Sequence, residues 1–279
     1  MDYREKLEFL KRELKDKGRV LIAFSGGVDS TFLLKVAREL LGKENVLAVT
    51  AKSQFFPDRE LQEAKAFCLD QDIEHLIISG DVLEQAELRK NPPDRCYICK
   101  KLIFEKILAV AAQKGITYVA EGSNLDDLED YRPGKKALAE LGIESPLLKA
   151  GLTKEEIRTL SREYGLASWS KPSLACLASR IPYGEEITEE KLSKIDLAEQ
   201  YLLDLGFKQV RVRYHGDVAR IELLPQDMAR ALEPSIAEGI YQKFAEIGFL
   251  YTALDLKGYR SGSLNERRHD LEKRHDLLK

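Results

Sequence analysis

The chain has 279 residues, of which 44% are hydrophobic and 33% charged, and its formal net charge is −3. This composition is typical of a water-soluble globular protein, and the slightly acidic charge argues against a large nucleic-acid-binding surface. No apolar run approaches the roughly 20 residues of a membrane-spanning helix, and the charged N-terminus lacks a signal-peptide core. We therefore expect a cytoplasmic protein without membrane or nucleic-acid partners, whose four cysteines are thiols or metal ligands.

Strands and helices alternate through the first 165 residues. An amphipathic helix is predicted over residues 2–16, and the apolar run at residues 20–24 is long enough only for a buried strand. Further strands are predicted at 46–50, 75–79 and 117–121, and helices at 31–41, 57–71, 94–114 and from Thr153, which forms a capping box with Glu156, to just before Gly165. This alternation predicts an α/β fold with a doubly wound, mostly parallel sheet, in which ligands bind at the carboxyl ends of the strands.

The pattern changes after residue 165. Residues 166–185 carry the only tryptophan and Cys176 and show little periodicity, so we expect a loop there. A small α+β domain is predicted from a helix at 188–205, a hairpin of strands at 209–214 and 218–224, two helices, and a strand at 249–255. The expected division is a nucleotide domain (1–165), a cysteine-bearing loop or linker (166–185), the small domain (186–259) and a charged, disordered tail (260–279).

A glycine-rich hexapeptide stands between the first strand and the next helix. Its sequence is Ser25-Gly26-Gly27-Val28-Asp29-Ser30. The glycines let the backbone approach an anion, and the helix N-terminus adds about half a positive charge. Ser25 and Ser30 offer hydroxyl groups to phosphate oxygens, and Asp29 can hold a phosphate-bound Mg²⁺. The lysine of a Walker A loop is absent, and the hexapeptide instead resembles the pyrophosphate loop (PP-loop) of the ATP pyrophosphatases. The alternative is a turn that only connects strand to helix.

A polar turn at residues 121–127 follows the fourth strand. Because it also leaves the carboxyl end of a strand, Gly122 and Asn124 are expected to face the nucleotide. Thr50, at the end of the second strand, is assigned to the same nucleotide site. For each residue of the turn at 121–127, a solvated turn is the alternative.

Cys96 and Cys99 form a CxxC pair at or near the start of a predicted helix, followed by Lys100 and Lys101. The helix dipole and the lysines are expected to favour thiolates, and we include Lys101 among the candidate catalytic residues. CxxC alone leaves three alternatives open: a redox pair, half of a zinc site, or two buried small residues. Zinc would need four ligands, and the sequence has no second CxxC.

Cys176 is the remaining cysteine in a plausibly functional segment, because Cys68 falls among the apolar positions of a helix and is expected in the core. Three thiolates can hold three irons of a [4Fe–4S] cluster and leave the fourth iron open. Cys96, Cys99 and Cys176 are therefore candidate ligands of such a cluster. Arg180, four residues after Cys176, can steady a phosphate or a carboxylate near the thiol.

Arg211 and Arg213 are two residues apart on a predicted strand and should point to one face of it. Two adjacent guanidinium groups suit a phosphate, which they can grip with charge-assisted hydrogen bonds. The alternative is a solvated strand face.

Taken together, these motifs resemble the LarE family of ATP-dependent sulfur transferases, which build the nickel-pincer nucleotide cofactor of lactate racemase. The resemblance extends to about residue 259 and is most specific at residues 176–184; it rests on residues 25–30, 96–101, 121–124, 175–184 and 210–213. It implies an adenine-nucleotide-hydrolase-like PP-loop domain, the cofactors ATP and Mg²⁺, a homo-oligomer assembled through the small domain, and enzymes of the nickel-pincer pathway as partners.

The reaction that this resemblance implies uses pyridinium-3,5-biscarboxylic acid mononucleotide as substrate. ATP adenylates each carboxylate and releases pyrophosphate, and sulfur from the enzyme then displaces AMP to leave a thiocarboxylate. In family members with a single active-site cysteine, at the position of Cys176, that cysteine is consumed and becomes dehydroalanine. The additional Cys96 and Cys99 make this chain resemble the branch proposed to deliver sulfur from a [4Fe–4S] cluster. Both routes stay open.

Other functions share parts of the pattern. A tRNA-thiolating enzyme also combines a PP-loop with three cysteines and a cluster, but the acidic charge and the lack of zinc-knuckle cysteines argue against it. An ammonia-using synthetase, such as an NAD or GMP synthetase, would not need Cys176. A nucleotide-sensing module without catalysis is the alternative of a different class.

Overall fold

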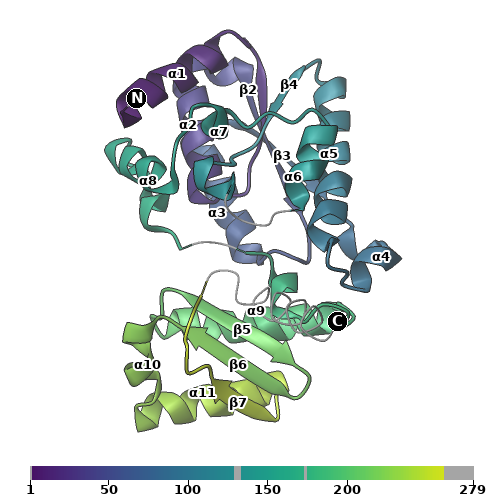
Figure 1. The fold of residues 1–279 in the computed structure, drawn as a ribbon, viewed down its shortest axis with the longest axis vertical. Coiled ribbons are helices and arrows are strands. Elements are labelled where there is room, and N and C mark those ends of the chain that lie inside the picture. The colour runs from purple at the N-terminus through teal and green to yellow at the C-terminus, as the bar shows by residue number, and fades with distance from the viewer. Residues whose placement is uncertain (1, 129–132, 173–174, 261–279) are drawn as a thin grey trace, which may run out of the picture. The chain divides into compact units, whose positions relative to one another are not determined.

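The computed structural model describes residues 2–128, 133–172 and 175–260 (Figure 1). The chain divides into two compact units, which we describe separately. The first contains Met1–Glu84 and Pro93–Leu174, and the second contains Gln85–Pro92 and Ala175–Lys279. The short segment Gln85–Pro92 thus belongs with the C-terminal part of the chain, which the sequence did not indicate. The predicted tail beyond residue 260 lies outside the described residues.

The first unit is an α/β layer structure around a four-stranded parallel sheet, as predicted. Its strands are β1 (Val20–Ala23), β2 (Val46–Lys52), β3 (Glu74–Ser79) and β4 (Tyr118–Ala120), in the order β3-β2-β1-β4. Its helices are α1 (Tyr3–Lys15), α2 (Val28–Leu41), α3 (Asp58–Asp70), α5 (Arg95–Gln113), α6 (Gly134–Glu140), α7 (Pro146–Lys149) and α8 (Lys154–Glu163). Short 3₁₀ turns lie at η1 (Lys43–Asn45), η2 (Val82–Glu84), η3 (Leu125–Leu128) and η4 (Ala167–Ser170).

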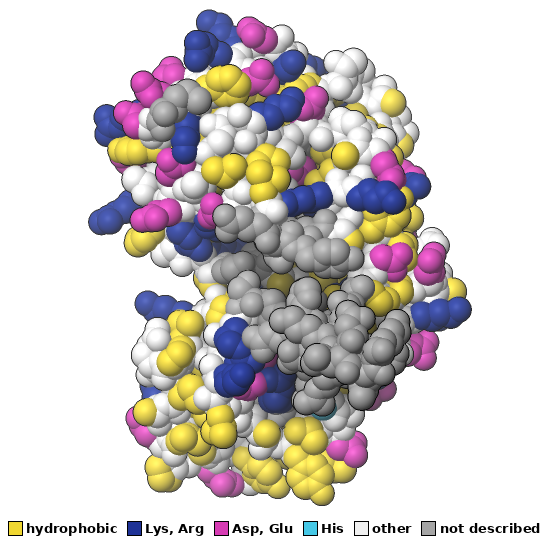
Figure 2. All heavy atoms as spheres, in the orientation of Figure 1, with side chains coloured by type: hydrophobic (Ala, Val, Ile, Leu, Met, Phe, Trp, Pro, Cys, Tyr) yellow, Lys and Arg dark blue, Asp and Glu magenta, His cyan; other side chains and the backbone are white. Residues whose placement is uncertain are grey.

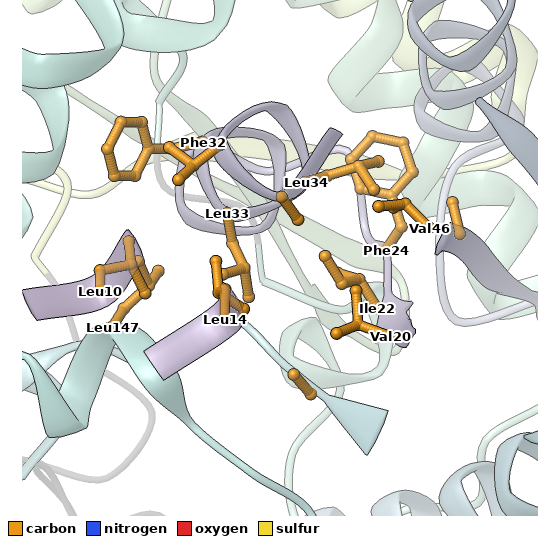
Figure 3. Packing of buried hydrophobic residues seen from close by; sticks show 14 of the residues in the cluster. Leu10, Leu14, Val20, Ile22, Phe24, Phe32, Leu33, Leu34, Val46 and Leu147 are labelled. Carbon is orange, nitrogen blue, oxygen red and sulfur yellow. The ribbon is translucent and has the colours of Figure 1, made fainter. Parts of the chain in front are cut away.

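Successive residues of β1 pack into two separate hydrophobic cores, one on each face of this sheet. Val20 and Ile22 join one cluster with Leu14 of α1 and Leu33 of α2 (Figure 3). Leu21, between them, packs into the other cluster with β2 and α5 residues. Burial on both faces explains why the first strand is continuously apolar, which is the pattern expected of a parallel strand.

Capping side chains set the beginnings of two first-unit helices. The predicted capping box of Thr153 and Glu156 is present at α8, and Asp2 and Glu5 form a second one at α1. Each box pairs a side-chain acceptor with a backbone N–H in both directions and satisfies groups that the helix leaves open. Helix α2 instead begins after Gly27, whose backbone is extended and which has no side chain to cap the helix. The first turn of α2 therefore lacks the side-chain cap that the other two helices have.

The second unit is the predicted small α+β unit. Strands β5 (Val210–His215) and β6 (Val218–Leu223) form the predicted antiparallel hairpin, and β7 (Tyr251–Leu254) pairs with β6 in parallel. The helices are α4 (Ala86–Arg89), α9 (Glu189–Asp204), α10 (Pro225–Ala231) and α11 (Pro234–Ile247), with one 3₁₀ turn, η5 (Leu177–Arg180). Val212 and Ile221 of the hairpin pack with Leu202 of α9 and Phe244 of α11 in one core.

The visible surfaces differ in character (Figure 2). Basic and acidic side chains are interspersed over the visible face of the first unit, whereas hydrophobic side chains gather on that of the second. The exposed large hydrophobic residues of the second unit are Leu197, Leu232, Tyr241, Leu250, Tyr251 and Leu256. Among the described residues, no helix combines the length and the apolar character needed to cross a membrane.

Candidate active site

The PP-loop connects β1 to α2 in the first unit. Its entry is fixed by a hydrogen bond from the backbone N–H of Phe24 to the carbonyl of Val49 in β2, 2.8 Å long. Gly26 has a φ of 71°, in the left-handed region where a side chain would be strained. The hydroxyl oxygens of Ser25 and Ser30 lie 3.0 Å apart across the loop. The loop therefore presents two hydroxyls and the N-terminus of a 14-residue helix to the same space.

The predicted polar turn after β4 lies against this loop. A Cβ added at Gly122 would approach the backbone nitrogen of Ser30 to 2.8 Å, so only glycine fits at this position. Within the turn, the side-chain oxygen of Asn124 accepts the N–H of Asp126, and the N–H of Asn124 donates to Asp127. Gly122 and Asn124 are thus brought to the PP-loop, with Asn124 buried rather than in a solvated turn.

Asp29 is the acidic group of the loop, and Lys154 is its partner. The ammonium group of Lys154, the first residue of α8, donates a hydrogen bond to Oδ2 of Asp29. The other carboxylate oxygen, Oδ1, is buried and lacks a hydrogen-bond partner among the described residues. Burial raises the pKa of Asp29, and the charge of Lys154 acts in the opposite direction. The sequence analysis did not identify Lys154 as a site residue, although its position at the start of a helix, directly after the capping residue Thr153, could have drawn attention to it.

Thr50 supports the loop from β2. Its hydroxyl donates to the carbonyl of Phe24, 2.7 Å away, and lies 2.8 Å from Nε2 of His75. Because the single Thr50 proton goes to Phe24, Nε2 of His75 must carry the proton of the second hydrogen bond. Burial lowers the pKa of His75, with the charge of Lys65 acting in the same direction, so the ring is neutral near pH 7. These contacts give Thr50 a role in holding the strand end before the loop.

Lys171 is a second residue that sequence reasoning missed. Its ammonium group lies 2.6 Å from carboxylate oxygens of both Glu60 and Glu63 and donates to the carbonyl of Gly26, 3.2 Å away. This bond ties the segment that leads toward Cys176 to the PP-loop within the first unit. The Gly26 carbonyl oxygen consequently faces the positively charged ammonium group of Lys171.

The cysteines occupy different environments. Cys96 and Cys99 lie in the first turns of α5, as predicted, with Cys96 exposed and Cys99 half-buried. Cys176, in the second unit, is half-buried, and it precedes η5 directly. Cys68 is in the core as expected, and burial raises the pKa of its thiol to about 12. Within the described residues, no group of three or more His, Cys, Asp or Glu side chains forms a metal site.

The two lysines after the CxxC pair are placed differently. The ammonium group of Lys101 lies 5.9 Å from the centre of the Tyr97 ring, a cation–π distance. Lys100 lies 3.8 Å from the carboxylate of Glu121 in the polar turn. Lys100 therefore connects the CxxC helix to the nucleotide side of the first unit. The sequence had singled out Lys101 instead.

Arg180 anchors the backbone at Cys176. Its guanidinium group makes two 2.8 Å hydrogen bonds to the carboxylate of Glu199 in α9, with both side chains buried. Its Nη1 donates to the carbonyls of Ala175 and Cys176, at 2.8 and 3.1 Å. Burial opposes the charge on Arg180, but the facing Glu199 outweighs it, so the pKa of Arg180 is raised. Arg180 is thus near Cys176, as predicted, but two of its nitrogens bind Glu199.

Arg211 and Arg213 share one face of β5, and both are buried, so the alternative of a solvated strand face is wrong. Arg213 makes two hydrogen bonds to Glu222 of β6, at 3.0 and 2.8 Å, and donates to the carbonyl of Ser179. Arg211 donates to the carbonyl of Val210 and stacks 5.3 Å from the centre of the Tyr259 ring.

These arginines lie close enough to Arg180 to interact with it. The pKa of Arg211 is lowered to about 10, first by burial and then by the positive charge of Arg180. An anion bound at this place would offset the repulsion. The second unit therefore contains a buried cluster of three guanidinium groups next to the backbone of Cys176.

Comparison with known proteins agrees with this geometry. The chain is 44% identical over 260 residues to an uncharacterised protein of Synechocystis sp., covering 93% of this chain and 97% of that protein. It is 39% identical over 253 residues to the pyridinium-3,5-bisthiocarboxylic acid mononucleotide synthase of Lactiplantibacillus plantarum, covering 91% of each. It is 32% identical to an argininosuccinate synthase of Natronomonas pharaonis over 162 residues, 54% of this chain and 39% of that one. A family model of NAD synthase matches residues 3–89.

The parallel sheet, the SGGVDS loop at the carboxyl end of β1 and the NAD synthase match define the class: this is an ATP-using enzyme of the PP-loop superfamily. The argininosuccinate synthase and NAD synthase matches cover only part of the chain, whereas the Lactiplantibacillus match covers nearly all of it. The chain belongs to the LarE family of sulfur transferases.

Proposed function

We propose that this protein is an ATP-dependent sulfur transferase that converts the two carboxylates of pyridinium-3,5-biscarboxylic acid mononucleotide to thiocarboxylates. The observation that carries the proposal is the likeness, over 91% of both chains, to a protein named as the synthase of the corresponding bisthiocarboxylic acid mononucleotide. We assign the residues described above to the two substrates: those of the PP-loop to ATP, and those of the arginine cluster to the mononucleotide.

ATP binding is assigned to the PP-loop. The backbone N–H groups at the start of α2 and the hydroxyls of Ser25 and Ser30 suit the β- and γ-phosphates. The buried Oδ1 oxygen of Asp29, which has no hydrogen-bond partner among the described residues, fits a Mg²⁺ ligand. Lys154 donates a hydrogen bond to the other carboxylate oxygen of Asp29, and its positive charge can balance the negative charge of the departing pyrophosphate. These residues favour cleavage between the α- and β-phosphates, which leaves AMP on the carboxylate.

The mononucleotide phosphate is assigned to Arg211 and Arg213. The support is the burial of both guanidinium groups on one face of β5; burial, and then the charge of Arg180, lowers the pKa of Arg211 to about 10. We assign Arg180 the role of a positioning residue. It donates hydrogen bonds to the carbonyls of Ala175 and Cys176, and its own guanidinium group is fixed by the carboxylate of Glu199. The substrate would then be fixed at its phosphate, with its ring carboxylates free to reach the sulfur donor.

Cys176 is assigned the role of the nucleophile, as in the LarE family that the chain belongs to. It is half-buried, in contrast to Cys68 of the core. A thiol is a suitable nucleophile for an acyl adenylate: the sulfur attacks the carboxyl carbon and AMP leaves.

We consider two sources for the sulfur: a cluster-bound hydrosulfide and the thiol of Cys176 itself. Three thiols, none of them as deeply buried as Cys68, fit the donor set of a [4Fe–4S] cluster held by Cys96, Cys99 and Cys176. Such a cluster would leave one iron open to carry a hydrosulfide. The other form sacrifices Cys176, which becomes dehydroalanine. Intact-protein mass after turnover separates them: retention of the full mass supports the cluster, and loss of one H₂S supports the sacrifice.

A homo-oligomer, pathway enzymes as partners and a cytoplasmic location stay predictions. The exposed Leu250 and Tyr251 beside and in the edge strand β7 support self-association of the second unit. Light scattering across a range of protein concentrations tests this, and Tyr251→Glu should shift the protein toward the monomer. A wild-type monomer at all concentrations would contradict it.

The fate of ATP tests the proposed reaction class. Purified protein with Mg·ATP and the mononucleotide should release AMP and pyrophosphate, and the release should depend on the mononucleotide. Parallel reactions with tRNA or with ammonia as the acceptor serve as controls. Production of ADP would contradict the PP-loop chemistry, and stimulation by tRNA or ammonia alone would contradict the substrate.

A further inference from the structure

Lys171 is fixed within the first unit at both its side chain and its backbone. Its ammonium group lies 2.6 Å from a carboxylate oxygen of Glu60 and 2.6 Å from one of Glu63, both on α3. Its backbone carbonyl accepts a 2.7 Å hydrogen bond from Arg158 of α8. The ammonium group also donates to the carbonyl oxygen of Gly26 in the PP-loop, 3.2 Å away. With a side chain only 15% exposed, Lys171 lacks the freedom of an ordinary surface lysine on its flexible stem.

The two carboxylates limit what Lys171 can do for a bound anion. Glu60 and Glu63 bring two negative charges to the single positive charge of the ammonium group. Because this cluster of three side chains is net negative, it does not attract a phosphate by itself. An effect of Lys171 on a bound phosphate therefore has to pass through its remaining contact, the carbonyl of Gly26.

The peptide bond between Gly26 and Gly27 can transmit this contact. The described residues contain no cis peptide bond, so the carbonyl of Gly26 and the N–H of Gly27 point in opposite directions. The carbonyl faces Lys171. The N–H faces the hydroxyl oxygen of Ser25, 3.4 Å away, and that oxygen lies 3.0 Å from the hydroxyl oxygen of Ser30. The N–H thus joins the two hydroxyls that we assign to the ATP phosphates.

A peptide between two glycines has little orientational preference of its own. Gly26 has a φ of 71°, and neither glycine has a Cβ that would resist rotation of the peptide plane. Rotation by half a turn would replace the N–H of Gly27 with the carbonyl oxygen of Gly26, whose partial negative charge repels a phosphate. A contact that holds this carbonyl on the opposite side therefore selects the orientation that binds an anion.

We propose that Lys171 is a positioning residue for ATP, which directs the N–H of Gly27 at the phosphates by holding the carbonyl of Gly26 on the other side of the peptide. The inference deepens the proposed function, because it rests on the assignment of the PP-loop to the β- and γ-phosphates. AMP lacks both of these phosphates, so its binding should not depend on Lys171. The contrast between the two nucleotides identifies the role, since damage to the fold would weaken both.

Calorimetric titration with Mg·ATP and with AMP, without the mononucleotide, tests the inference. Lys171→Met removes the ammonium group and should weaken Mg·ATP binding about tenfold, as expected for one hydrogen bond to a charged group, while AMP binding stays unchanged. Lys171→Arg keeps a charged donor and should keep most of the affinity. Lys35→Met is the matched control, because Lys35 of α2 is similarly buried, at 19% exposure, and its ammonium group contacts Gln71 and Glu39 instead of the PP-loop. It should bind both nucleotides like the wild type.

A double variant separates positioning from stability. Lys171→Met leaves the buried Glu60 without its ammonium partner, so this variant should melt below the wild type. Lys171→Met/Glu60→Met removes the uncompensated charge and offers no donor to Gly26. Its melting temperature should recover while Mg·ATP binding stays weak, and it carries the test if Lys171→Met does not fold.

Three results would overturn the inference: wild-type Mg·ATP affinity in Lys171→Met, an equal loss of AMP and Mg·ATP binding, or recovery of Mg·ATP binding in the double variant. The titrations use neither the mononucleotide nor a sulfur source. A failure of sulfur transfer is therefore distinguishable from a failure of this inference.

Discussion

The ammonium group of Lys154 donates a hydrogen bond to the carboxylate of Asp29, and this ion pair joins the first residue of α8 to the first turn of α2. The second oxygen of Asp29 is buried and without a partner among the described residues. When one oxygen of a buried carboxylate is hydrogen-bonded and the other has no partner, the second oxygen is available as a ligand for a cation. This pair supports our proposal that the Mg²⁺-dependent step of the reaction takes place at the N-terminus of α2.

Removing the Asp29 carboxylate should abolish catalysis without harming the fold. Asp29→Asn should lose Mg²⁺-dependent pyrophosphate release. Burial raises the pKa of Asp29, so the native protein binds this proton more tightly than the unfolded chain does and loses stability as pH rises through the folded pKa. The variant should therefore melt no lower than the wild type at pH 7. Asp58→Asn, at an exposed acid in the first turn of α3, is the control and should keep full pyrophosphate release. Equal activity of the two variants would contradict the assignment.

Lys154 should tune the pH dependence of the same step. Its charge lowers the pKa of Asp29 against the effect of burial, so Lys154→Met should raise that pKa further. The acidic limb of the pH–rate profile for pyrophosphate release should move to higher pH. Lys149→Met, which removes a lysine paired with Glu144 in the same unit, should leave the profile in place. An unshifted limb in Lys154→Met would mean that Asp29 does not control the reaction.

Arg213 should discriminate between the two ligands. Each charge-assisted contact to phosphate contributes about 1.5–3 kcal/mol, so Arg213→Ala should weaken the mononucleotide about ten- to a hundredfold and affect ATP far less. The structure adds a complication, because this change removes one of the arginines paired with the buried Glu222 and leaves it with Arg220. The double variant Arg213→Met/Glu222→Gln removes both charges of the pair and should show the same selective loss. Calorimetric titration with each ligand measures both affinities, and equal losses would place Arg213 in a structural role.

The pair of Arg180 and Glu199 should contribute mainly to stability. Arg180→Met leaves Glu199 buried without its main counter-charge and should cost about 3–5 kcal/mol of unfolding free energy. The double variant Arg180→Met/Glu199→Met should recover most of this loss. Burial raises the pKa of Glu199, but the charge of Arg180 outweighs it and the pKa is lowered. The contribution is therefore present above the ordinary glutamate pKa and is lost as pH falls through the folded value. Urea titration of both variants measures the difference, and equal destabilisation would contradict a pairwise interaction.

Much of the first unit could be predicted because its signals are local. The apolar run before Ser25, the glycines that follow it and the Thr153 cap each act within one turn or strand. The hairpin around Gly216 was likewise predicted from alternation and a turn, and the structure confirms it.

The long-range contacts of the site could not be predicted in the same way. Lys154 and Lys171 act on residues 125 and 145 positions away, and nothing in their immediate sequence reveals the partner. The arginines of β5 alternate as expected, but Glu222 became the partner of Arg213 only through the pairing of β5 with β6, and Glu199 of α9 binds Arg180 and the backbone of β5. Charged residues at such spacing resemble a solvated face until burial is known.

The most direct test of the account is the mass spectrum of the mononucleotide after incubation with the anaerobically reconstituted protein, Mg·ATP and a sulfide source. We predict that one and then both carboxylates exchange an oxygen for a sulfur, with AMP and pyrophosphate appearing in step. An unchanged mononucleotide in the presence of steady ATP cleavage to AMP and pyrophosphate would contradict the proposed sulfur transfer.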